Sequence, residues 1–168
     1  MPFPVSKRGT VTLSICIFTI ALLFIGFMIL KRPPLISADI RKQINFAIMV
    51  PSDNSLVDKK TVKYDPSKKI LSFLCDSFNS KLIVSEQAFP DQFVDVPQAY
   101  DRFLQQLPTI TSFEVINGQV NLAKPENLNG KTLAVMNGKG TFIFVHSQTK
   151  DLNENQWRTF FNSMDIIK

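Results

Sequence analysis

The apolar segment at residues 10–30 constrains this 168-residue chain more than any other feature. It runs from Thr10 to Leu30 without a charged residue or a proline, and basic residues border both of its ends. As an α-helix it would be roughly 31 Å long, about the hydrocarbon thickness of a bilayer. A buried core helix is the competing interpretation, but such helices usually carry polar residues along one side. The pattern therefore predicts one transmembrane helix at residues 10–30, in contact with membrane lipid.

Three other readings of the N-terminal region are weaker. A cleavable signal peptide has small residues at a cleavage site, whereas Ile29-Leu30 run directly into Lys31. A lipoprotein signal has its cysteine at the end of the apolar run, whereas Cys16 lies within it. Lys7-Arg8-Gly9 before an apolar stretch resembles a type IV pilin leader, but Pro33-Pro34 would break the long helix that pilins continue. We expect an uncleaved signal anchor, with a pilin-like subunit as an alternative.

The charge pattern leaves the orientation of this anchor nearly balanced. Lys7 and Arg8 precede the segment, while Lys31, Arg32 and the pair Arg41-Lys42 follow it. A short leader, an apolar segment and one large domain form the plan of a signal anchor, and large domains cross the membrane largely regardless of charge. We therefore expect a single-pass protein of the cell membrane, with a cytoplasmic N-terminus and the C-terminal domain outside.

Net charge gives little information about the partner of that domain. The chain has 19 basic and 14 acidic residues, for a net charge of +5. Four of these five charges come from Lys7, Arg8, Lys31 and Arg32, beside the apolar segment. The remaining domain is nearly neutral, so the basicity is a membrane signal and does not indicate nucleic-acid binding.

The sequence divides into a leader at 1–9, the membrane helix at 10–30, a proline-containing linker at 31–36 and a domain at 37–168. Hydrophobic alternation and turn residues predict strands in that domain. The expected strands are 45–50, ended by Pro51, then 61–64, 69–76, 81–87, 113–116, 119–123, 131–136 and 141–146, with residues 52–60 as a loop. Residues 78–80 are expected to turn the chain between two of these strands. Asn117-Gly118 and the segment 137–140 are expected to form hairpin turns, the first of them type I′.

Helices are expected at three places. Ser37 is a candidate N-cap for a short first helix. A second helix is expected at 97–107, with Asp95 near its cap and one buried face. In the last helix Asn153 is the N-cap and Gln156 completes a capping box, and the buried face is formed by Trp157, Phe160, Phe161 and Met164. These elements predict an α+β fold, in which two amphipathic helices pack on an antiparallel sheet of about six to eight strands.

The sequence contains few candidates for catalysis. The only histidine, His146, ends a predicted strand and could pair with Ser85 or Ser147 and with Asp76 as a hydrolase triad. The spacing matches no nucleophile elbow, and a solvent-facing histidine is the commoner case. A membrane-anchored hydrolase using His146 is therefore the alternative function, and no catalytic residue is assigned.

Metal, cofactor and phosphate sites are not indicated either. One histidine and one domain cysteine, Cys75, do not make a zinc site. Glu86 could lie at a sheet surface, where we expect a solvated or salt-bridged carboxylate. The lysine-rich run at 58–69 could contact anionic head groups or cell-wall polymer, although solvated loop lysines are the simpler interpretation. We expect no cofactor and no metal.

Short blocks spread over nearly the whole chain carry a resemblance to a known group of proteins. They are Ile40-Arg41-Lys42-Gln43, Asn45-Phe46, Val50-Pro51, Val84-Ser85-Glu86-Gln87, Pro90, Phe93, Gly140-Thr141-Phe142-Ile143, Gln156-Trp157 and Phe161-Asn162-Ser163-Met164. In these blocks the chain resembles small single-pass envelope proteins of unknown function from small-genome candidate-phylum bacteria. A fainter similarity is to extracytoplasmic domains of bacterial anti-sigma and sporulation proteins. The resemblance implies an outward-facing, non-enzymatic domain and transfers no functional residues.

Together, these features predict a membrane-anchored extracytoplasmic module of the bacterial envelope that binds or interacts without catalysis. Its partner is expected to be an envelope protein, a polymer or a hydrophobic ligand.

Overall fold

The computed structural model describes residues 34–168. Within them, Leu35–Lys168 form one compact unit. The apolar segment at 10–30 lies outside the described residues, as do the leader and the first half of the linker, residues 31–33. Among residues 34–168, no helix has the length and apolar content needed to cross a bilayer.

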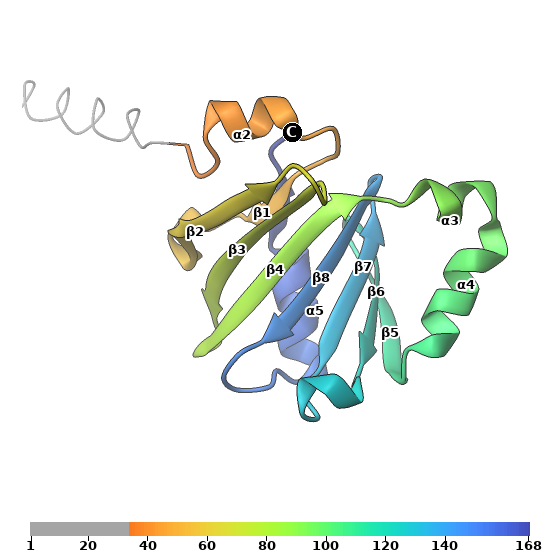
Figure 1. Cartoon of the computed structure of the whole chain (residues 1–168). Helices are drawn as coiled ribbons and strands as arrows, with labels where there is room; N and C mark the ends of the chain where they lie inside the picture. Colours follow the sequence, from red (N-terminus) through yellow and green to blue (C-terminus); the bar gives the residue numbers. More distant parts are fainter. Residues whose placement is uncertain (1–33) are drawn as a thin grey trace, which may run out of the picture. The chain divides into compact units, whose positions relative to one another are not determined.

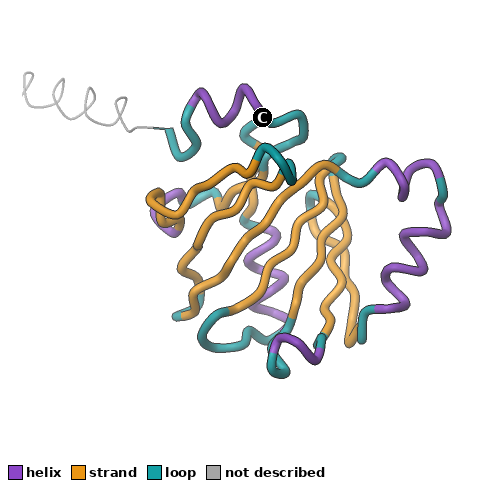
Figure 2. Tube along the Cα trace, viewed as in Figure 1, coloured by secondary structure: helices purple, strands orange, loops and turns teal. Residues whose placement is uncertain are grey.

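A seven-stranded antiparallel sheet forms the body of this unit (Figures 1 and 2). Its strands, in spatial order, are β2 (Val57–Asp65), β3 (Ile70–Ser77), β4 (Ser80–Ala88), β8 (Thr141–Ser147), β7 (Leu133–Gly138), β6 (Gly118–Ala123) and β5 (Thr109–Val115). Two meanders, β2–β4 and β5–β8, therefore meet where β4 pairs with β8. Helices α3 (Asp91–Asp95) and α4 (Pro97–Gln106) connect the two meanders. The α+β class and the antiparallel sheet expected from the sequence are confirmed.

One face of the sheet, which we call the core face, packs against helix α5 (Glu154–Asn162), seen behind the sheet in Figure 1. Side chains alternate between faces along a strand, so Ile143 and Val145 of β8 enter this core. From α5, Trp157, Phe160 and Phe161 are buried in the same core, as the sequence predicts. The predicted capping box is confirmed, because Asn153 and Gln156 each accept a backbone N–H at 3.0 Å.

The opposite face, which we call the outer face, carries an aromatic cluster. Phe142 of β8 is 2% exposed and forms edge-to-face contacts with Phe89 and Phe103, at centroid distances of 5.8 and 5.6 Å. Phe93 and Tyr100 complete the cluster from α3 and α4. The cluster holds the two helices against the sheet. The helical face predicted to be buried is only half-buried, because it packs on one side of a single sheet.

A second, two-stranded sheet joins the two ends of the described chain. Strand β1 (Met49–Pro51) pairs antiparallel with β9 (Met164–Ile166), next to helix α2 (Ala38–Gln43). The predicted N-cap of α2 is confirmed, since Ser37 Oγ accepts the N–H of Ile40 at 3.3 Å. The strand predicted at 45–50 is shorter than expected and includes Pro51. The short strand β9 is not anticipated by the sequence.

Two predictions are wrong, one for the loop at 52–60 and one for the cap of the second helix. Residues 52–60 contain the 3₁₀ turn η1 (Asn54–Leu56) and the first part of β2, which has an irregularity between Asp58 and Lys63. Polar residues extend along β2 because it is an edge strand whose outward side faces water. The N-cap residue of the second helix, α4, is Val96, and no side chain caps this helix with a hydrogen bond. Asp95 is therefore not its cap.

The turn expected within 137–140 is confirmed, whereas the first hairpin turn differs from the type I′ expectation. Val115 pairs with Gly118, so Ile116 and Asn117 occupy the β5–β6 turn and neither has a positive φ. Gly118 serves a different purpose, because a Cβ there would lie 2.2 Å from the carbonyl oxygen of Asn137. Left-handed residues occupy the other three hairpin turns, at Lys69 between β2 and β3, at Phe78-Asn79 between β3 and β4, and at Lys139-Gly140 between β7 and β8.

Candidate functional site

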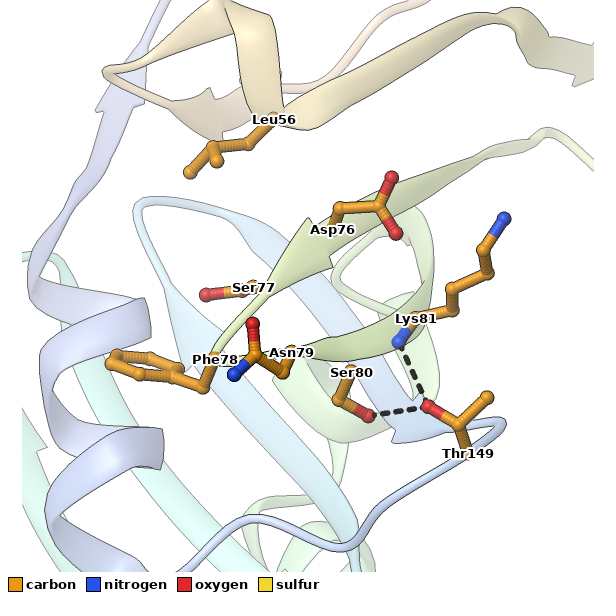
Figure 3. Close-up of a pocket in the computed structure, with 8 residues that line it drawn as sticks. All are labelled: Leu56, Asp76, Ser77, Phe78, Asn79, Ser80, Lys81 and Thr149. Atoms are coloured by element: carbon orange, nitrogen blue, oxygen red, sulfur yellow. Dashed lines mark hydrogen bonds between the residues drawn. The ribbon is translucent and has the colours of Figure 1, made fainter.

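A cavity of about 580 Å³ lies beside the β3–β4 turn, and we call it the turn pocket (Figure 3). Strands β3 and β4 and the turn between them supply most of its lining. The 3₁₀ turn η1 supplies one apolar side chain, and the loop after β8 supplies one hydroxyl. The lining residues are Leu56, Asp76, Ser77, Phe78, Asn79, Ser80, Lys81 and Thr149. The pocket therefore combines one aromatic ring with amide, hydroxyl and charged groups.

Phe78 occupies an unusual position at the edge of this pocket. Ser77 and Ser80 pair across a two-residue turn in which Phe78 and Asn79 have φ values of 51° and 58°. Asparagine tolerates this left-handed backbone, whereas a bulky residue pays roughly 1–2 kcal/mol to adopt it. Phe78 is also 38% exposed and is not part of the hydrophobic core. Glycine or asparagine at this position would serve the turn better.

The opposite side of the pocket is fixed by a hydroxyl network. Ser80 Oγ lies 2.6 Å from Ser147 Oγ and 3.0 Å from Thr149 Oγ1, and it donates to the carbonyl oxygen of Lys150 at 2.7 Å. The backbone N–H of Lys81 donates to Thr149 Oγ1 at 3.1 Å. Ser80 and Ser147 are buried. These hydroxyls tie the loop after β8 to β4, so their role in the pocket is structural and none is free as a nucleophile.

Charged and apolar groups lie at different ends of the pocket. Asp76 and Lys81 are cross-strand partners and both are exposed. Figure 3 places the ring of Phe78 and the side chain of Leu56 on one side, and Asp76 and Lys81 on the other. Such a surface suits a ligand that has an apolar face and hydrogen-bonding groups around it.

Within residues 34–168, no hydrogen-bonded triad forms among the residues of the hydrolase hypothesis. His146 lies on the outer face of β8, opposite Ile83 of β4, whereas its neighbour Ser147 points to the core face. Ser85 pairs with Phe144 and is therefore a diagonal neighbour of His146 on the outer face, whereas Asp76 lies at the turn pocket, where His146 is not among the lining residues. Burial, followed by the charge of Lys131, lowers the pKa of His146. The imidazole is therefore neutral at pH 7, and no hydrogen bond within residues 34–168 connects it to these serines or to Asp76.

Glu86 differs most from its sequence-based expectation. It is 0% exposed and lies on the core face between Leu71 of β3 and Ile143 of β8, so it is neither solvated nor salt-bridged. Its Oε2 accepts the backbone N–H of Met49 at 3.2 Å, and Oε1 has no partner among the described residues. Burial raises the pKa of Glu86 well above its ordinary value, against a smaller lowering by the Met49 hydrogen bond.

The position of Glu86 gives it a structural role. Thr141 donates a hydrogen bond to the carbonyl oxygen of Ala47 at 2.6 Å, close to the contact of Glu86 with Met49. The two side chains fasten the segment leading into β1 to the core face. The alternation Leu82, Val84, Glu86 was a signal for this burial, because all three residues face the same side of β4.

The cysteine of the domain is also confined to the core. Cys75 is 1% exposed, and burial raises the pKa of its thiol to about 12. The thiol is therefore protonated and poorly reactive. Within residues 34–168, no three His, Cys, Asp or Glu side chains cluster closely enough to hold a metal ion.

Comparison with known proteins provides no relative from which a site can be transferred. No protein-family model matches the chain, and no curated protein or solved structure is significantly similar to it. The candidate site therefore depends on the geometry of the turn pocket. Sequence reasoning identifies the turn at 78–80, but it does not identify the exposed aromatic ring or the loop that completes the pocket.

Proposed function

We propose that this chain is a membrane-anchored binding module of the bacterial envelope, and that its domain binds a saccharide polymer through the turn pocket. The apolar segment at 10–30 would hold the chain in the membrane, with the domain outside. The side chains that line the pocket match the chemistry of a sugar. An aromatic ring packs on the apolar face of a sugar ring, and amide, carboxylate and hydroxyl groups bind its hydroxyls.

The observation that carries the proposal is the left-handed, exposed Phe78. A bulky residue in this backbone conformation costs stability, and costs of this kind are concentrated at functional sites. Phe78 lies outside the hydrophobic core, and 38% of the residue remains exposed. Contact between Phe78 and a ligand would explain why this turn contains an aromatic residue.

The positions of the titratable groups with shifted pKa values favour a binding function over a catalytic one. Glu86 and Cys75 are sealed in the core, and His146 is separated from the turn pocket. Asp76 and Lys81 are close to the pocket but exposed. The pocket thus combines an aromatic ring with polar and charged groups, and the hydroxyls of Ser80 and Thr149 also hydrogen-bond within the protein.

Phe78→Asn tests the proposal. The full chain is placed in nanodiscs of zwitterionic lipid, and its binding to purified peptidoglycan sacculi is measured by co-sedimentation. Because an aromatic anchor is lost, we expect at least about a tenfold loss of affinity. Asparagine is more compatible with the left-handed backbone, so we expect the urea midpoint of the domain to stay equal or rise.

Ile110→Asn is the matched control, since Ile110 is 55% exposed on β5 and lies outside the turn pocket. It should bind as the unsubstituted chain does. Equal sacculus binding by Phe78→Asn and the unsubstituted chain would refute the role of the turn pocket. Absence of sacculus binding by the unsubstituted chain would refute the saccharide ligand proposed for the turn pocket.

A further inference from the structure

A second concave surface lies on the outer face, beside the β2–β3 turn. Two adjoining hollows of about 540 and 380 Å³ share Lys68 in their lining. Strands β3 and β4 contribute polar side chains together with Ile70 and Ala88, and β2 and the β2–β3 turn contribute the lysines. We call the polar part of β3 and β4 the floor. We call this surface the lysine groove and define it by Ser72, Ser85, Gln87, Lys63, Lys68 and Lys69.

The floor of the groove follows from the sheet register. Ser72 of β3 pairs with Ser85 of β4, and both are only half-buried. Gln87 is the next residue of β4 on the same face and pairs with Phe142, the centre of the aromatic cluster. The floor therefore offers two hydroxyls and an amide on a rigid sheet, beside the packed helices α3 and α4.

The turn that carries two of the lysines is well fixed. Asp65 Oδ1 accepts the N–H of Ser67 at 3.0 Å, the hydroxyl of Ser67 at 2.6 Å and the N–H of Lys68 at 3.3 Å. These bonds, first among them that of the Ser67 hydroxyl, keep the pKa of Asp65 below its ordinary value. Lys69 follows with a φ of 56°. The turn thus holds Lys68 and Lys69 at one edge of the groove, and Asp65 is occupied within the turn.

The lysine charges are available to a partner. Lys63, Lys68 and Lys69 are exposed, and within residues 34–168 none of them forms an ion pair. Asp65 and Asp91 are the acids in the lining, so positive charge is in excess there. An anionic group entering the groove would gain contacts with these ammonium groups, of which that of Lys68 already lies near the carboxylate of Asp65.

The lining favours a hydrophilic polymer over a membrane surface. Insertion into a bilayer requires exposed apolar side chains, and none of the strongly exposed large apolar residues of the described chain lines the groove. A concave floor of hydroxyl and amide groups instead matches sugar hydroxyls. Ammonium groups along one wall match carboxylates or phosphates along a chain.

We propose that the lysine groove binds an acidic polysaccharide, with Lys63, Lys68 and Lys69 contacting its anionic groups and Ser72, Ser85 and Gln87 its hydroxyls. This inference rests on the proposed binding function and adds the charge class of the polymer. It uses a surface separate from the turn pocket, so variants of the two surfaces report on the two proposals independently.

The test compares polygalacturonate with its methyl ester, which has the same sugar backbone without the charge. The full chain in zwitterionic nanodiscs should bind polygalacturonate and not the ester. Raising the salt concentration from 50 to 200 mM should weaken binding on the order of tenfold if three charges are neutralised. The triple variant Lys63→Gln, Lys68→Gln, Lys69→Gln should lose at least tenfold in affinity and most of the salt dependence.

The matched control is Lys42→Gln, Lys124→Gln, Lys150→Gln, which removes the same charge at exposed positions outside the groove. It should retain the affinity of the unsubstituted chain. Equal losses in the two triple variants would overturn the proposal in favour of nonspecific attraction. Binding to phosphatidylglycerol vesicles that depends on the groove, without binding to polygalacturonate, would overturn it in favour of a membrane surface. Thermal unfolding confirms that each variant is folded.

The outcomes also separate this inference from the proposed function. If Phe78→Asn loses sacculus binding while the groove variant keeps its polygalacturonate affinity, the function stands and the inference fails. If sacculi are not bound but polygalacturonate binding depends on the groove lysines, the turn pocket proposal fails and the inference stands.

Discussion

Glu86→Gln should remove a defined part of the pH dependence of stability. The carboxyl is fully buried, and its pKa is raised well above the ordinary value by desolvation. Below the ordinary pKa, Glu86 is protonated in both the folded and the unfolded chain and contributes no pH dependence. Above it, the unfolded chain ionises while the folded chain keeps its proton. Unfolding then releases a proton, so stability falls as the pH rises.

The size of this effect follows from proton linkage. Between the ordinary pKa and the raised one, a single released proton lowers the free energy of unfolding by about 1.4 kcal/mol for each pH unit. Glutamine has nearly the same shape and carries no charge at any pH. Its amide oxygen can still accept the N–H of Met49. The two proteins should therefore be similar in stability near pH 4, and the variant should become progressively more stable than the unsubstituted chain as the pH rises.

Urea unfolding at several pH values, followed by tryptophan fluorescence, measures this difference. Trp157 is the only tryptophan and is completely buried, so its emission reports the unfolding of the domain. Glu114→Gln is the control, because Glu114 is an exposed carboxylate on β5. Its stability profile should run parallel to that of the unsubstituted chain. Parallel profiles for Glu86→Gln and the unsubstituted chain would show that Glu86 is not a buried neutral acid.

Two further predictions concern the core and a close backbone contact. Gly138→Ala should destabilise the domain by at least about 2 kcal/mol, because a Cβ there would lie 1.8 Å from the carbonyl oxygen of Asn117. Gly130→Ala, with no atom within 4 Å of its Cβ but a φ of 75°, should cost only about 1 kcal/mol in the same urea assay; equal losses would contradict the steric argument. In a Cys16→Ala background, Cys75 should resist maleimide at pH 8 until urea unfolds the domain, because its pKa is about 12 and it is buried. Rapid labelling of the folded protein would disprove that burial.

Features that depend on neighbouring residues could be predicted from the sequence. The capping box of Asn153 and Gln156 uses positions three apart, and the apolar face of α5 repeats with the helical period. The β2–β4 meander follows from alternation interrupted by turn residues. These signals are local, so they do not depend on how distant segments of the chain pack.

Features that depend on distant segments could not be predicted. Strands β1 and β9 have three residues each and gain their order from pairing across the whole domain. Burial of Glu86 requires the segment before β1 to cover the core face. Gly118 looks like a hairpin residue in the sequence, yet its lack of a Cβ permits contact with the turn of another hairpin.

The candidate surfaces show the same division. Sequence reasoning finds the turn at 78–80 and the lysine-rich run at 58–69. It does not reveal that the loop around Thr149 completes the turn pocket, or that Ser85 and Gln87 lie beside Lys68. Those neighbours come from sheet register, which a single sequence specifies only weakly.

The pairing of β1 with β9 has a consequence for the order of folding. Its partners come from opposite ends of the described chain, and the N–H of Ile167 donates to the carbonyl oxygen of Ile48 in the same contact. Contacts that close so large a loop carry a high entropic cost, which favours their formation after local hairpins. During synthesis, β1 therefore cannot pair until β9, the last strand, has been made. Until they meet, Glu86 is without its Met49 partner, and the burial that raises the pKa of its carboxyl is incomplete.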